Sequence, residues 1–158
     1  MRVEYINPFV EAAHNVLKEV LQVDVQRGEL YLKSTAAPVL GVAAIIGLAG
    51  DVEGRVLLDM SRSTAVDIAS GMLKSMDMEP ITELNEMGRA TITELANMIT
   101  GQAVTKLHDL GFKFDLTPPA LVTGDNMEIS NTNVEALIVP MEMPQGKMEI
   151  NVAIRERG

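Results

Sequence analysis

Residues 90–105 read ATITELANMITGQAVT and form the middle of the longest helical pattern in the chain. On a helical wheel of about 100° per residue, large apolar residues fall on one side: Ile92, Leu95, Ile99 and Leu110. Small or polar residues fall on the other: Ala90, Glu94, Asn97, Gly101 and His108. The pattern predicts a helix that buries its apolar side and turns Glu94 and Asn97, at i and i+3, away from the core.

The polar side of this helix differs from an ordinary solvated face, because Glu94 is its one ionisable residue between positions 90 and 105. Asn is a poor residue for the middle of a helix, and Gly101 costs about 1 kcal/mol relative to Ala. The small residues Ala90 and Gly101 would let a partner approach the backbone closely. The alternative is a partly covered helix on which Glu94 and Asn97 are incidental, since E-x-x-N is short and common.

Around this helix, which is expected over Thr82–Leu110 with Gly111 at its C-terminus, the pattern predicts two further helices and several strands. A helix opens at Asn7-Pro8 and runs to about Leu21, and another follows the capping residue Ser61, over 63–74. Strands are expected at 23–32, 39–48, 52–60, 120–123, 127–130, 134–143 and 147–155. Each half thus has a helix followed by strands, which indicates a weak duplication and an α+β fold with long helices on one face of a mostly antiparallel sheet.

Composition limits the classes of protein to consider. The 158 residues fit one domain, over 1–158, and 47% are hydrophobic, which excludes disorder. The net charge of -9 argues against nucleic acid as a partner. No apolar run is long enough for a membrane span, and the charged N-terminus lacks a signal-like core, so we expect a cytoplasmic protein.

Other candidate sites are weaker than the Glu94 face. Glu11, His14 and His108 could be imagined as metal ligands, but two scattered histidines and no cysteine make surface placement the better interpretation. Gly50 and Gly54 lie in a predicted hairpin and lack the Lys-Ser/Thr that a phosphate-binding loop needs.

Three segments together resemble one protein family. Residues 94–101, ELANMITG, resemble the E-x-x-N helix signature of the CheC/CheX/FliY phosphatases. Residues 116–124, LTPPALVTG, are similar to the segment that follows this helix in CheX proteins, and 47–54, GLAGDVEG, to their central hairpin. CheC-like relatives carry the signature on two helices. Here the first helix has Glu11 and His14, with Asn15 one position late, so the chain resembles the single-site CheX type.

The resemblance implies a CheC-like fold and a chemotaxis phosphatase that hydrolyses the phospho-aspartate of a CheY-type response regulator. The regulator would bring Mg²⁺ and a Lys, and this protein would need no cofactor of its own. By resemblance, Asn97 would orient the attacking water, Glu94 would pair with the regulator's Lys, and Ala90 and Gly101 would contact the partner.

The resemblance also implies a homodimer formed through sheet edges, for which 39–48 and 134–139 are the candidate segments. Two other functions stay open. The same fold serves in flagellar-switch proteins that bind partners without hydrolysis, and a CheC-like protein could be regulated by a CheD partner.

Overall fold

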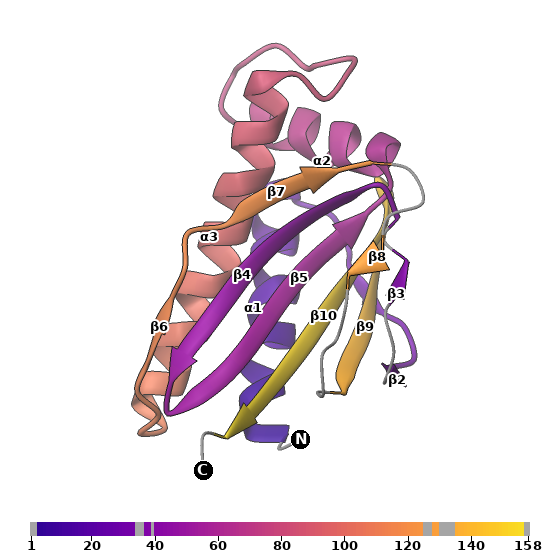
Figure 1. Cartoon of the computed structure of the whole chain (residues 1–158). Coiled ribbons are helices and arrows are strands. Elements are labelled where there is room, and N and C mark those ends of the chain that lie inside the picture. Colours follow the sequence, from indigo (N-terminus) through magenta and orange to yellow (C-terminus); the bar gives the residue numbers. More distant parts are fainter. Residues whose placement is uncertain (1–2, 34–36, 39, 125–127, 130–134, 157–158) are drawn as a thin grey trace.

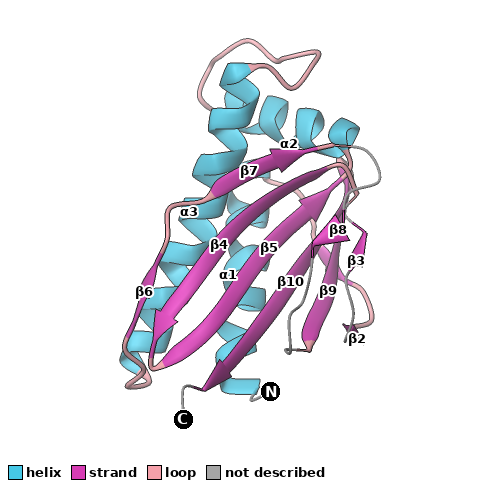
Figure 2. Cartoon of the chain, viewed as in Figure 1, coloured by secondary structure: helices cyan, strands magenta, loops and turns pink. Residues whose placement is uncertain are grey.

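The computed structural model describes residues 3–33, 37–38, 40–124, 128–129 and 135–156. Within these residues, three helices cover one face of a large antiparallel sheet, as the α+β expectation required (Figures 1 and 2). The helices are α1 Val3–Leu21, α2 Arg62–Ser75 and α3 Glu86–Asp109. The strands are β1 Gln26–Arg27, β2 Tyr31–Lys33, β3 Ala37–Pro38, β4 Val42–Gly50, β5 Val52–Met60, β6 Phe114–Leu116, β7 Ala120–Thr123, β8 Glu128–Ile129, β9 Ala136–Met143 and β10 Gly146–Glu156.

Two long hairpins form the centre of the sheet. The order is β1-β9-β10-β5-β4-β6, with β2 also on β9 and β7 also on β4, while β3 and β8 form a separate small pair. The hairpins meet where β5 pairs with β10, and Val56 lies opposite Val152 there. Each half of the chain contributes one long helix and one long hairpin, in keeping with the predicted duplication.

The two segments that were predicted to form edges of the sheet do not lie at its edges. β4, within the expected 39–48 segment, pairs with β5 on one side and with β6 and β7 on the other. β9 likewise pairs with β10 and with the short strands β1 and β2. Segments distant in sequence therefore cover both positions, and the outer strands of the sheet are β1 and β2 at one end and β6 and β7 at the other.

Helix α1 begins earlier than predicted and contains Pro8. A proline at this position removes only one helical hydrogen bond, to the carbonyl of Glu4. The added turn buries Tyr5 and Ile6, and the Tyr5 ring packs edge-on against Phe112 with 4.7 Å between centroids. Burial of these two side chains outweighs the missing bond.

One further boundary differs for a local reason. The expected strand 23–32 is divided into β1 and β2, because Pro140 on the facing strand has no amide to donate and the chain instead places Gly28 N 2.9 Å from the Pro140 carbonyl. The short strand β6 was not predicted at all. Val39, Met127, Ser130 and Val134, which were expected in strands, lie outside the described residues. Strand β5 occupies the predicted range Val52–Met60.

Candidate active site

The site is built on α3, whose ends are fixed by local hydrogen bonds. Asn85 caps the first turn, accepting from Gly88 N at 2.9 Å, so the helix starts at Glu86 and not at Thr82. At the other end Gly111 has a φ of 95°, which favours glycine. Leu110 is the C-cap and 55% exposed, so the expectation that it joins the core was wrong: the helical wheel no longer applies once the helix has ended.

The two faces of α3 are those that the sequence predicted. Ile92, Leu95 and Ile99 are fully buried, whereas Glu94 and Asn97 are exposed. The threonines on the helix bond back to its own carbonyls, Thr100 Oγ1 to Ala96 O at 2.8 Å for example, and so do not compete for Glu94 or Asn97. The helix therefore holds the two side chains on a rigid, core-anchored element.

Glu94 and Asn97 are unengaged in the described part of the chain. Neither side chain has a hydrogen bond or an ion pair among the described residues, and both side chains are exposed. A carboxylate and an amide that use none of their bonding capacity within the protein are available to a bound partner.

Two small residues flank this pair on the same exposed face. Ala90 lies one turn before Glu94 and Gly101 one turn after Asn97. A Cβ added at Gly101 would meet nothing within 4 Å, so the helix backbone is open to an approaching surface. The sequence-predicted residues thus form one continuous strip along α3.

A groove borders this strip on the side of Glu94. Its volume is about 630 Å³, and it lies where α3 passes the C-terminal ends of α1 and α2. The residues lining it are Glu19, Val20, Gln22, Met72, Ser75, Met76, Ala90, Thr91, Glu94 and Met98. Sequence reasoning missed the contributions of α1 and α2, because no local pattern shows that two helix ends converge on a third helix.

The other candidate residues lie apart from this strip. Glu11 pairs with Lys106 at 3.1 Å, and His14 Nε2 lies 2.9 Å from the carbonyl of Val25. His108 lines a separate hollow of about 660 Å³ together with Asp51 and Asp115. Among the described residues, no three His, Asp or Glu side chains are grouped so as to hold a metal ion.

The glycine hairpin and Ser61 have structural roles. At Gly54, whose φ is 146°, a Cβ would lie 1.8 Å from the Ala153 carbonyl oxygen, so glycine is needed for the close approach of β10. Ser61 caps α2, accepting from Thr64 N at 3.1 Å, as predicted. Within the described residues, none of the helices combines the length and the apolar character that a membrane span requires.

Comparison with known families gives a match in the centre of the chain. The family model of the chemotaxis phosphatase CheX matches residues 42–142, more than half of the sequence. A curated relative, the CheY-P phosphatase CheX of Thermotoga maritima, is 24% identical over 158 residues and is matched over 100% of both chains.

Solved structures agree over nearly the whole chain. A chain in the CheX-CheY-BeF3-Mg²⁺ complex from Borrelia burgdorferi is 45% identical, with a TM-score of 0.82 over 98% of this chain and 100% of that one. A CheC-like superfamily protein from Shewanella sp. PV-4 is 28% identical, with a TM-score of 0.86 over 98% of this chain and 99% of that one.

Proposed function

Since the chain belongs to the CheX family of chemotaxis phosphatases, we propose that it hydrolyses the phospho-aspartate of a CheY-type response regulator through Glu94 and Asn97. The observation that carries the assignment is the exposed, unengaged E-x-x-N pair on the rigid face of α3. The Borrelia burgdorferi relative, solved with CheY, BeF3 and Mg²⁺, supports a regulator as the partner. A regulator of this kind acts inside the cell, so the proposal includes a cytoplasmic location.

Asn97 is assigned to the attacking water. Phosphoryl transfer passes through a loose transition state, so the alignment of the nucleophile contributes more than its deprotonation. An amide both donates and accepts hydrogen bonds and carries no charge that phosphate would repel. Asn97 can therefore hold a water in line with the phosphorus while the core-anchored helix fixes its own position.

Glu94 is assigned to a cation of the regulator. A carboxylate beside a phosphoryl group is repelled by it but attracted to a neighbouring Lys, so Glu94 anchors the complex and does not attack. The Mg²⁺ that neutralises phosphoryl charge belongs to the regulator in this proposal, and the described residues of this chain present no grouping of three acidic or histidine side chains for it.

A non-catalytic binding module is the second candidate, and the two differ in what Asn97 does. Asn97→Ala should lower kcat by about 10² or more, because misplacing a reacting group costs about that much, while binding of the phosphorylated regulator persists. Gln102→Ala is the matched control, since it removes another exposed amide from the same helix. Parental kcat in Asn97→Ala would show that Asn97 does not position the attacking water. Absence of phosphate release by the parent protein, with the phosphorylated regulator still bound, would favour the binding module.

Glu94→Lys tests the second role. It would place two cations together and should raise KM for the phosphorylated regulator. Neither substitution should lower the free energy of unfolding by more than about 0.5 kcal/mol, because both side chains are exposed and unengaged in the described structure. Circular dichroism and a thermal melt check that condition before the kinetics.

A further inference from the structure

The groove beside Glu94 combines an apolar floor with acidic walls. Met72 is buried in its floor, and Val20 and Met98 are half-buried beside it. Met76 stands at the rim with 56% of its surface exposed. Methionine side chains adapt to different shapes and are used repeatedly at binding surfaces. This floor suits the aliphatic part of a partner side chain.

The charged side chains that line the groove have one sign. Glu19 and Glu94 both line it, no Lys, Arg or His does, and neither carboxylate has an ion-pair or hydrogen-bond partner among the described residues. Helices α1 and α2 end beside it, at Leu21 and Ser75, and a helix C-terminus carries partial negative charge. The last turns of these helices also carry Lys18 and Lys74, which do not line the groove, so the lining carboxylates are the main reason that a cationic group is favoured here.

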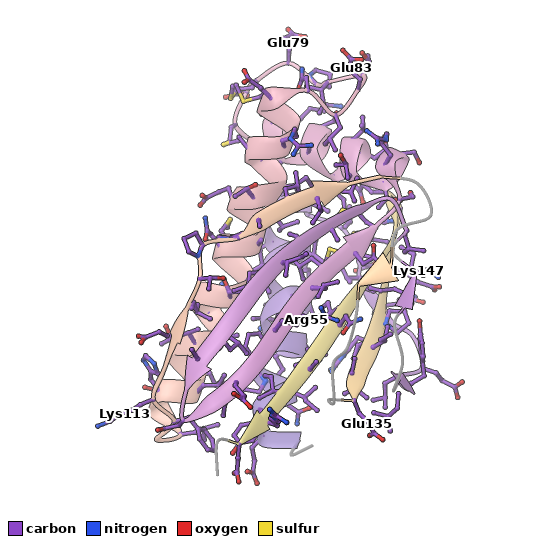
Figure 3. All side chains as sticks on the ribbon, in the orientation of Figure 1. Arg55, Glu79, Glu83, Lys113, Glu135 and Lys147 are labelled. Carbon is purple, nitrogen blue, oxygen red and sulfur yellow. The ribbon has the colours of Figure 1, made fainter. Side chains whose placement is uncertain are left out.

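The chain that connects α2 to α3 extends this negative field. Between Lys74 and Arg89, this connection and the first turn of α3 carry four acidic residues and no basic one: Asp77, Glu79, Glu83 and Glu86. Figure 3 shows Glu79 and Glu83 on the loop beyond the N-terminal end of α3. A field of one sign raises the local concentration of oppositely charged groups and increases association rates.

We propose that this groove accepts a Lys or Arg side chain of the response regulator, with its aliphatic stem on the methionines and its charged head on Glu19. The inference rests on the proposed function and adds a second cation contact to the one assigned to Glu94. Long basic side chains place their stems on apolar surface while the charge stays in a polar setting. A purely apolar occupant would leave the Glu19 carboxylate desolvated and unpaired, and an anionic one would be repelled. Glu19 is thus a docking residue that selects the partner.

The test uses Borrelia burgdorferi CheY, phosphorylated with acetyl phosphate and Mg²⁺, because the relative solved with CheY is 45% identical to this chain. Glu19→Gln should raise KM about fivefold at low salt and leave kcat unchanged, since a docking charge acts on association. KM of the parent should rise with ionic strength, and this rise should be smaller in Glu19→Gln. Glu135→Gln is the control: it removes the same charge from an exposed position that Figure 3 places at the far end of the molecule.

A second pair of variants tests the apolar floor. Met76→Gln should raise KM severalfold with kcat unchanged, because the stem of the incoming side chain loses apolar contact. Leu110→Gln is matched to it, since Leu110 is 55% exposed and lies at the other end of α3, outside the groove. Thermal melts of all four variants should agree with the parent, as each replaced side chain is exposed.

The outcomes separate the two proposals. If the parent protein does not hydrolyse phosphorylated CheY, the proposed function fails and this inference with it. If the parent hydrolyses it and Glu19→Gln and Met76→Gln keep parental KM and salt dependence, the groove is not a dock and the proposed function stands. A fall in the kcat of Glu19→Gln at constant KM would likewise overturn the docking role of Glu19.

Discussion

Replacing Gly101 by Ala should stabilise the protein and impair its reaction at the same time. The position is inside α3, its φ is not in the left-handed region, and an added Cβ would meet nothing within 4 Å. Alanine is more favourable than glycine in a helix interior by about 0.8–1.0 kcal/mol, because glycine loses more backbone entropy on folding. In a chain of this size, that corresponds to a rise in Tm of about 2–4 °C.

Gly88 provides the control in the same helix. A Cβ at Gly88 would lie 2.6 Å from Ile81 Cδ1 and 3.3 Å from Leu84 Cδ1, so these side chains must move and the gain in helix propensity is offset. Gly101→Ala should therefore be the more stable of the two variants in urea unfolding and in thermal melts. If Gly101→Ala lowers Tm, or is less stable than Gly88→Ala, the space beside Gly101 does not accept a methyl group.

The functional half of this prediction depends on the partner. The added methyl group lies one turn from Asn97 on the exposed face, where the regulator is proposed to dock. A displacement of about 1 Å in a catalytic complex can cost 10² in rate, so kcat/KM should fall by about tenfold or more. A stabilised variant with parental kcat/KM would show that no partner approaches the helix at Gly101.

Three further predictions concern other parts of the molecule. Replacing Glu11 and His14 together by Ala should leave turnover within a few-fold of the parent, because the first helix lacks the Asn of an E-x-x-N pair. The exposed Glu11–Lys106 ion pair contributes at most about 1 kcal/mol to stability. A loss of turnover as large as that of Asn97→Ala would reveal a second site. The protein should be a homodimer by light scattering at micromolar concentration, because Leu30 and Leu32 at the β2 edge are 63% and 60% exposed. Leu32→Glu should then give the mass of a monomer. A monomeric parent protein would contradict the predicted dimer. Burial and the hydrogen bond to Glu149 raise the pKa of Tyr31 from 10.0 to about 12, so its contribution to stability is present below pH 10 and lost between pH 10 and 12. In urea unfolding, the free energy of unfolding of Tyr31→Phe should therefore fall less steeply with pH over this range than that of the parent. Identical pH dependence of the two proteins would contradict this prediction.

Much of this fold could be predicted because its elements are long and regular. Strand β5 was placed to the residue, and the buried and exposed faces of α3 followed from the spacing of Ile92, Leu95 and Ile99. Local capping chemistry also located the start of α2 at Ser61. The exposed positions of Glu94 and Asn97 are confirmed, while their catalytic roles stay a prediction.

The errors arose where distant segments meet. The Asn7-Pro8 pair predicts a helix start there, since only the burial of Tyr5 and its contact with Phe112 show that the helix extends upstream. The segments chosen as sheet edges are covered by strands far away in the sequence. Glu19 and Met76 were not suspected of any function, because each is an ordinary residue of a helix end until the packing of three helices places them around one groove.

The pairing of β5 with β10 in the middle of the sheet has a consequence for biosynthesis. While the ribosome is still adding the residues of β10, the β4–β5 hairpin exposes a complete set of unpaired backbone groups along β5. The sheet can close only after residues 146–156 have left the exit tunnel, so its folding has a large non-local component and is expected to be slow for a chain of this length. In that interval the nascent chain is at its most vulnerable to aggregation, and shortening the chain within β10 would make the vulnerable state permanent.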